Sequence, residues 1–290
     1  MRTGKLTMNN NLLPWLFLGP SLLGFALFYL LPFITGFYYS LVDSPLSGNF
    51  VGLHNYAALL QNPSFLLALS NTAKFTVICV PLNMALSLGT ALLLNRKIRG
   101  RNLFRTIFIT PLVIPVASVV LVWQAFFDLN GVLNSLIHAL GYQSVDWLKT
   151  DWSRVVILVV YLWKNIGYCM ILFLAGLQNI PVEYYEAARI DGANRFQEFF
   201  RITLVYLTPT TFFVFVISII NSFKVFRETY LIAGDYPQNS IYMLQHYMNN
   251  MFLALDYQKL TSAAFVMAAF IVAVVFLLFR VERKISKRIG

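Results

Sequence analysis

Uncharged, mainly apolar stretches recur six times along the 290-residue chain, and polar segments separate them. Five of these stretches contain no charged residue, and the sixth is interrupted only by Lys164. A helix needs about 20 apolar residues to cross the hydrocarbon core of a bilayer. The pattern therefore predicts an all-α, polytopic membrane protein with six transmembrane helices. Their expected bounds are residues 12–42, 75–94, 106–127, 155–180, 202–223 and 261–279.

The first stretch is predicted to be a retained membrane helix rather than a secretory signal. Its 31 uncharged residues far exceed the roughly 7–15 apolar residues of a signal sequence. No long linker, low-complexity tract or clear repeat interrupts the rest of the chain. We therefore expect a single domain over residues 1–290.

Positive charge is distributed unevenly among the polar segments. Of the 22 Lys and Arg residues, 15 lie at the two ends of the chain and after the second and fourth stretches, whereas the alternate segments hold only 3. Cytoplasmic loops are enriched in Lys and Arg, so both termini are predicted to be cytoplasmic. This bias explains the net charge of +10 better than nucleic-acid binding does, and no nucleic-acid partner is expected.

Composition and missing motifs narrow the possible functions. Hydrophobic residues make up 58% of the chain and charged residues 12%, which is about half the charged share of soluble domains, so the surface is expected to contact membrane lipids. The chain contains no glycine-rich phosphate loop, no Gly-x-Ser-x-Gly motif and no His-Glu-x-x-His motif. Its three histidines are far apart, and its two cysteines lie within apolar stretches. We therefore expect no catalytic site and no metal site.

Residues 181–205, between the fourth and fifth stretches, predict two short helices joined by a tight turn. Pro181 suits a helix start because it has no N–H group to leave unpaired. Gly192 can take the left-handed conformation that ends a helix, and Asn194 can cap the next helix with Gln197 as its reciprocal partner. Such a helix pair either lies along the lipid headgroups or docks another protein through its small residues.

The order of residues in this segment has a specific spacing. It reads Glu186-Ala187-Ala188, three residues, Gly192, nine residues, Ile202, one residue and Leu204. This spacing resembles the EAA loop of binding-protein-dependent ABC importer permeases, and residues 174–193 are similar to the sugar-importing class that includes the maltose and glycerol-3-phosphate permeases. The resemblance extends from about Pro14 onward. It departs from the family at Val205, where proline is usual, and at residues 233–237, where a Thr-Gly-Gly-Gly-Pro-like run is common.

The resemblance implies a type I ABC importer permease fold in a bacterial cytoplasmic (inner) membrane. It implies a subunit that forms half of a translocation path for a sugar, with an oligosaccharide as the expected cargo. The expected partners are a second homologous permease, a dimeric ATPase and an extracellular or periplasmic sugar-binding protein. ATP and Mg²⁺ would bind the partner ATPase, so no cofactor is expected on this chain. The residues expected to couple to the ATPase are Glu183, Glu186, Ala187, Ala188, Asp191 and Gly192.

Two sets of polar residues are candidates for lining the path. Those in the fourth stretch share one helix face because their spacing is i, i+3, i+4, i+7, and those in the fifth stretch form a similar polar patch. Packing between helices is the alternative for both sets. The candidates are Tyr161, Lys164, Asn165 and Tyr168, with Ser218, Asn221 and Ser222.

Lys164 requires a compensating partner because a charged side chain within a membrane is unfavourable. The six stretches contain no Asp or Glu, so the candidates are an acid of the homologous permease, an acidic sugar, or an outer-loop acid such as Asp128. The absence of carboxylates also argues against the alternative function, an ion-coupled secondary transporter.

Overall fold

The computed structural model describes residues 13–46 and 48–289. Within these ranges the backbone is almost entirely helical, and the one β contact is an isolated antiparallel bridge between Val42 and Phe50. Six stretches are long and apolar enough to cross a membrane, which confirms the predicted class. They are Trp15–Tyr39, Pro63–Asn95, Val116–Ala139, Ser153–Gln178, Thr208–Ala233 and Tyr257–Arg280.

The chain divides into two compact units. The smaller unit combines the chain up to Gln61 with Met251–Val266, and the larger unit combines Asn62–Asn250 with the chain from Met267 onward. Helix α15 (Tyr257–Ile289) contributes to both. The single domain over residues 1–290 stays a prediction.

In the smaller unit, the N-terminal helices pack on the start of α15. Helix α1 (Leu13–Phe25) continues through a π-helical turn (Ala26–Leu30) into α2 (Leu31–Tyr39). The rings of Phe33 and Phe37 on α2 meet the Phe265 ring edge-on, with centroids 5.0 and 5.3 Å apart. After a loop, α3 (His54–Leu60) completes the unit.

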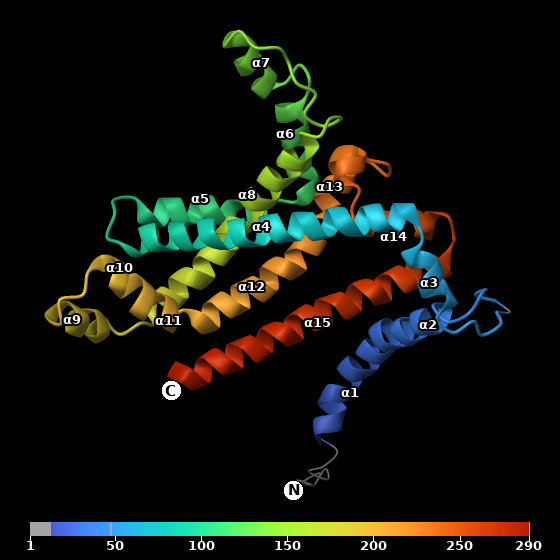
Figure 1. The fold of residues 1–290 in the computed structure, drawn as a ribbon, viewed down its shortest axis with the longest axis horizontal. Coiled ribbons are helices and arrows are strands. Elements are labelled where there is room, and N and C mark those ends of the chain that lie inside the picture. Colours follow the sequence, from blue (N-terminus) through green and yellow to red (C-terminus); the bar gives the residue numbers. More distant parts are fainter. Residues whose placement is uncertain (1–12, 47, 290) are drawn as a thin grey trace, which may run out of the picture. The chain divides into compact units, whose positions relative to one another are not determined.

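The larger unit is built around two long helices, α4 (Pro63–Asn95) and α8 (Ser153–Gln178), which pack along each other. Helices α5 (Arg101–Val113) and α12 (Thr208–Phe223) pack against this pair (Figure 1). The Asn62 side chain caps α4 by accepting hydrogen bonds from the backbone N–H groups of Ser64 and Phe65, so the start of α4 is encoded locally. Its remaining elements are α6 (Val116–Phe127), α7 (Val132–Ala139), α9 (Val182–Ile190), α10 (Arg195–Glu198), a π turn (Phe199–Thr203), α11 (Leu204–Tyr206), α13 (Phe226–Ala233), a 3₁₀ turn (Asn239–Ile241) and most of α14 (Leu244–Leu253).

The predicted third helix, residues 106–127, is wrong as a continuous element. The structure breaks it at Ile114, whose ψ of 132° is extended, and α6 begins after Pro115. A proline ring disfavours helical geometry in the residue before it, which accounts for the position of the break. Figure 1 shows α5 and α6 running in different directions. The third stretch long and apolar enough to cross a membrane is Val116–Ala139, which spans α6 and α7.

A glycine allows α5 and α8 to approach closely. A Cβ atom at Gly167 of α8 would lie 1.7 Å from the backbone oxygen of Phe108 on α5. Small residues at helix crossings are a common device in membranes because they bring two backbones together. This crossing holds α5 beside the polar residues of α8.

Candidate functional site

A polar cavity of about 240 Å³ lies where α8, α12 and α13 meet. It contains four of the seven predicted path residues, three on α8 and one on α12. The remaining lining residues come from the end of α5, from the turn between α12 and α13, and from the first turn of α13. The full lining is Leu112, Tyr161, Lys164, Asn165, Asn221, Lys224, Val225, Arg227 and Glu228.

The Lys164 ammonium group donates a hydrogen bond to the Glu228 carboxylate and forms an ion pair with it. The Glu228 side chain is 6% exposed and that of Lys164 is 26% exposed. The prediction that the spans contain no carboxylate is therefore wrong, because the stretch Thr208–Ala233 includes Glu228. The predicted fifth helix ended at Phe223, and α13 extends the apolar stretch beyond a short turn at Lys224 and Val225.

Amide groups connect α8 to α12 beside this ion pair. The Asn221 side-chain amide donates to Asn165 Oδ1 at 3.1 Å, and the Asn165 amide donates to the backbone oxygen of Tyr161 at 2.8 Å. The Tyr161 hydroxyl in turn donates to the backbone oxygen of Ser218 at 3.0 Å. Both asparagine side chains are thereby oriented at the cavity, where carbonyl and amide groups suit sugar hydroxyls as hydrogen-bond partners.

Three predicted path residues lie elsewhere. Ser218 is fully buried and accepts from the Asn83 amide of α4 at 3.1 Å. The Ser222 hydroxyl lies 2.9 Å from that of Thr76, also on α4. Tyr168 packs on the apolar cluster around Cys169 and Phe173. In this structure these residues hold helices together, the alternative raised from the sequence.

The cavity carries an excess of positive charge. Three cations, Lys164, Lys224 and Arg227, line it together with a single carboxylate, Glu228. In the sequence, Lys224 and Arg227 follow the fifth apolar stretch as anchors at a helix end would, and Glu228 falls in the segment after it. Arg227 and Glu228 lie three and four residues after Lys224, a spacing that puts all three side chains on one side of a helical turn. This spacing is the signal that could have identified the three residues from the sequence.

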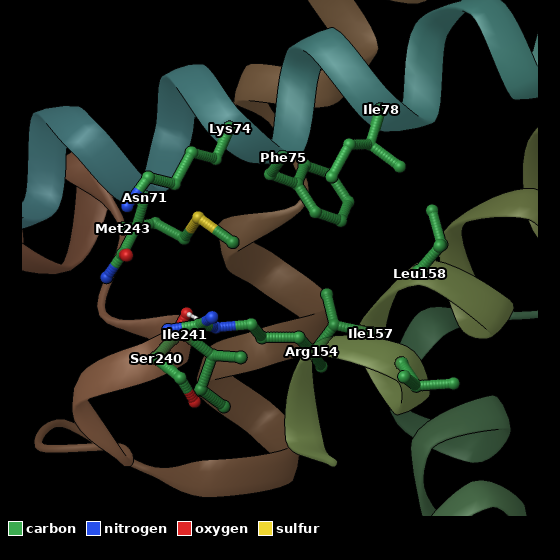
Figure 2. A pocket seen from close by; sticks show the side chains of 11 residues that line it. Asn71, Lys74, Phe75, Ile78, Arg154, Ile157, Leu158, Ser240, Ile241 and Met243 are labelled. Atoms are coloured by element: carbon green, nitrogen blue, oxygen red, sulfur yellow. Dashed lines mark hydrogen bonds between the residues drawn. The ribbon is translucent and has the colours of Figure 1, made fainter. Parts of the chain in front are cut away.

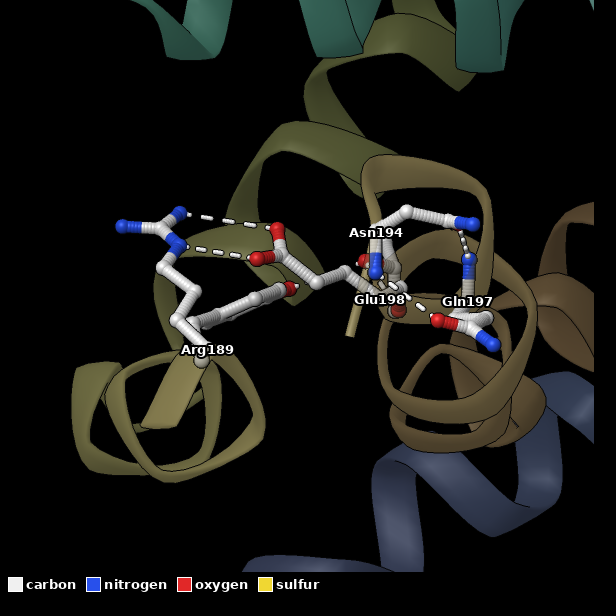
Figure 3. Close-up of polar contacts among 6 residues, drawn as sticks. Arg189, Asn194, Gln197 and Glu198 are labelled. Atoms are coloured by element: carbon white, nitrogen blue, oxygen red, sulfur yellow. Dashed lines mark hydrogen bonds and ion pairs between the residues drawn. The ribbon is translucent and has the colours of Figure 1, made fainter. Parts of the chain in front are cut away.

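The predicted coupling segment forms the expected pair of helices. Helix α9 follows Pro181 and ends before Gly192, whose φ of +80° is left-handed. Asn194 and Gln197 form the predicted capping box, with hydrogen bonds of 2.9 and 2.8 Å (Figure 3). The candidate coupling residues lie on the surface of this segment. Glu183, Glu186, Ala187, Asp191 and Gly192 are exposed, and Ala188 is half-buried.

Two side-chain contacts join the helices of this segment. Arg189 on α9 donates from Nε to Glu198 Oε1 at 2.8 Å and from Nη2 to Oε2 at 3.5 Å (Figure 3). This contact lowers the pKa of the Glu198 carboxyl and raises the pKa of the Arg189 guanidinium, as expected for an opposite charge within hydrogen-bonding distance. The Tyr185 hydroxyl lies 3.0 Å from that of Thr203. These contacts hold α9 against α10 and the π turn. The Ile190 side chain lies on the outer surface of the segment and is 87% exposed.

Similarity to known proteins identifies the family. Residues 83–290 match the family described as "binding-protein-dependent transport system inner membrane component". The chain is 35% identical over 271 residues to the arabinooligosaccharides transport system permease protein AraP of Bacillus subtilis, covering 91% of this chain and 86% of AraP. It is 33% identical over 240 residues to the trehalose/maltose transport system permease protein MalF of Thermococcus litoralis, covering 81% of each.

A solved structure shows the same fold. A bacterial ABC transporter involved in the import of the acidic polysaccharide alginate matches with a TM-score of 0.83 and 24% identity, over 94% of this chain and 95% of the matched chain. The resemblance predicted from the coupling segment is thus confirmed, and the molecule is a transport subunit rather than an enzyme. This chain belongs to the multi-pass inner-membrane components of binding-protein-dependent transport systems.

Proposed function

We propose that this chain is a permease subunit of an ATP-driven importer of oligosaccharides and that the polar cavity is part of its translocation path. The charged and amide groups of the cavity carry this proposal, because they converge at one point among otherwise apolar helices. Intramembrane ionisable residues commonly mark substrate pathways. AraP and MalF are named for the transport of arabinooligosaccharides and of trehalose or maltose, which supports a sugar as the cargo.

The charge balance of the cavity favours an acidic sugar. Glu228 compensates Lys164, so the original argument from an unpaired Lys164 no longer holds. Lys224 and Arg227, however, leave two positive charges without a carboxylate in the lining. A uronate-containing oligosaccharide would supply the missing negative charge, while its hydroxyls would meet Asn165 and Asn221.

The coupling segment is proposed to seat α9 in a groove of a partner ATPase. Its exposed acids, small residues and Ile190 offer a charged and apolar surface, and the Arg189–Glu198 contact would transmit movement of α9 to the helix leading into α12. The complete transporter would contain a second homologous permease, a dimeric ATPase that binds ATP and Mg²⁺, and an extracellular or periplasmic sugar-binding protein. ATP-driven closure of the ATPases would then switch the permeases between inward-open and outward-open states.

The test is uptake by the assembled transporter in proteoliposomes, with its binding protein outside and ATP inside. Neutral and uronate-containing oligosaccharides of equal length are compared. Lys224→Gln and Arg227→Gln should each raise the KM for the acidic sugar about fourfold relative to the neutral one, the effect of one charge at roughly 5 Å in a wet cavity. The matched control is Lys149→Gln, an exposed cation outside the cavity.

The outcomes separate the parts of the proposal. Uptake that needs neither ATP nor the binding protein would refute the importer itself. Uptake that needs both, but with equal KM changes for neutral and acidic sugars, would refute only the acidic cargo.

A further inference from the structure

A second cavity, of about 270 Å³, lies between α4 and the start of α8. It shares no residue with the polar cavity. Figure 2 shows α4 along one side and the start of α8 with the segment around the 3₁₀ turn along the other. Most of the lining is apolar, including Phe75, Ile78, Ile157 and Leu158. Its polar members are Asn71, Ser240 and two cations, Lys74 and Arg154.

The two cations have no carboxylate partner in the described part of the chain. No Asp or Glu lines the cavity, and neither cation takes part in the ion pairs of residues 13–46 and 48–289. Arg154 donates from Nε to the backbone oxygen of Ser240 at 3.2 Å, so this contact orients the guanidinium without neutralising it. Two fixed positive charges therefore lie beside an apolar space.

The positions of these cations correspond to the level of the lipid headgroups. Helix α4 has 33 residues and is about 50 Å long, whereas the hydrocarbon core is only about 30 Å thick. Lys74 directly precedes the uncharged run that starts at Phe75, and Arg154 directly precedes the run that starts at Val155. Both cations thus lie where the hydrocarbon begins, and the apolar lining extends from them into the span.

The cavity is accessible from outside the helix pair. Ile78 is 57% exposed and Val155 is 42% exposed, although both lie in membrane-spanning stretches. Their exposure is expected for residues that face acyl chains rather than water. A lipid could therefore enter sideways, with its chain against these residues.

We propose that this cavity binds one anionic phospholipid, with the phosphate between Lys74 and Arg154 and part of one acyl chain along Phe75, Ile78 and Leu158. Basic pockets between transmembrane helices bind anionic headgroups, and the absence of a carboxylate in the lining favours a net negative headgroup over a zwitterionic one. Binding at this point would link α4 to α8 at the end where α8 begins.

The first test measures lipid retained by the purified, assembled transporter. The transporter is exchanged into detergent containing phosphatidylglycerol or phosphatidylcholine, and bound lipid is counted by native mass spectrometry. Phosphatidylglycerol should be retained preferentially by the wild type. The Lys74→Gln/Arg154→Gln variant should bind it about thirty-fold more weakly, as expected for the loss of two basic contacts, whereas Lys149→Gln should match the wild type.

The second test locates the acyl chain. Ile78→Trp places a fluorophore at an exposed lining position, and its emission is obtained as the difference from the wild type, which has five tryptophans. Phosphatidylglycerol with brominated chains should quench this emission more than brominated phosphatidylcholine, and the Lys74→Gln/Arg154→Gln background should abolish the difference.

Three results would overturn the proposal. They are equal retention of both lipids by the wild type, unchanged phosphatidylglycerol binding in the double variant, or cross-linking of Ile78→Cys to a partner subunit. The last result would show that a protein surface, rather than a lipid, covers the cavity.

Discussion

The Lys164 ammonium group on α8 and the Glu228 carboxylate on α13 form an ion pair between residues 64 positions apart in the chain. Both belong to stretches that are apolar enough to cross a membrane. The pair neutralises Lys164 in the middle of the fourth span and ties the first turn of α13 to α8. Lys224 and Arg227 then determine the net charge of the cavity.

Removing one member of this pair should destabilise the protein more than removing both. Glu228→Gln leaves a largely buried cation unpaired, which costs roughly 3–5 kcal/mol in a fully buried pair. We expect about 2 kcal/mol here, because the Lys164 side chain retains 26% exposure. Lys164→Met in the Glu228→Gln background should restore part of the loss. The four proteins to compare are the wild type, Glu228→Gln, Lys164→Met and the double variant. Their thermal unfolding in detergent gives the interaction energy of the two side chains, and strictly additive effects would argue against a stabilising pair.

Close approach of α5 to α8 should depend on Gly167. Gly167→Ala places a Cβ against the backbone oxygen of Phe108, 1.7 Å away, so α5 must move, at a cost of about 1–3 kcal/mol or more. The control is Gly89→Ala on α4, where no atom lies within 4 Å of the new Cβ. Melting temperatures in the same detergent should fall for the first variant only. Equal melting temperatures would mean that the crossing is wider than the structure shows.

His246 should make the stability of the protein depend on pH. The ring is fully buried on α14, accepts a hydrogen bond from the backbone N–H of Met243 at 3.2 Å, and meets the Phe226 and Tyr242 rings. Burial lowers its pKa from 6.5 to about 4, although Asp235 acts in the opposite direction. Well above pH 6.5 the ring is neutral in both the folded and the unfolded protein. Its burial then contributes fully to the free energy of unfolding, with no dependence on pH.

As the pH falls from 6.5 to about 4, the unfolded chain binds a proton that the folded chain does not. The free energy of unfolding should therefore fall by about 3 kcal/mol over this window. His246→Asn keeps a hydrogen-bond acceptor but does not titrate, so its melting temperature should vary less between pH 6.5 and 4. Parallel pH profiles for the two proteins would contradict the burial of a neutral imidazole.

Local features of this protein were predictable from sequence, and long-range pairings were not. The ends of α9 and the capping box follow from Pro181, Gly192, Asn194 and Gln197, because each acts on its own backbone neighbours. The break at Pro115 was missed because proline is tolerated within membrane helices, where neighbours satisfy the freed backbone groups. Composition alone does not distinguish a kink from a break.

The candidate path was predictable only in part, for a related reason. Helical spacing correctly grouped Tyr161, Lys164 and Asn165, but it does not say which neighbour a face contacts. Ser218 and Ser222 face α4 and bond to it. Glu228 was missed because its partner lies on a different helix, and pairing across helices leaves no short-range pattern.

The orientation of the chain can be tested by cysteine labelling in intact cells. Ile190→Cys on α9 and Leu46→Cys in the loop after α2 are suitable because the native side chains are 87% and 98% exposed. The native Cys79 and Cys169 are buried and should not react. A membrane-impermeant maleimide should label Leu46→Cys from outside and Ile190→Cys only after permeabilisation. The reverse pattern would place both termini outside.

Charge reversal on α9 should uncouple the permease from its ATPase without unfolding it. Glu186 is exposed, so Glu186→Lys should change the free energy of unfolding of the purified subunit by no more than about 0.5 kcal/mol. If α9 docks on the ATPase, the new positive charge should reduce ATPase co-purification and ATP-driven uptake together. Asp151→Lys makes the same charge change at an exposed residue before α8 and should leave both unchanged.

Gly192→Val tests the same surface through its backbone. A β-branched residue resists the left-handed φ of +80° observed there, so the turn after α9 should reorganise and the Arg189–Glu198 contact should loosen. Since a Cβ at Gly192 would have no atom within 4 Å, loss of ATPase binding would reflect the altered turn rather than a steric clash within the chain. Normal ATPase co-purification and normal uptake in both Glu186→Lys and Gly192→Val would mean that α9 only lies along the lipid headgroups.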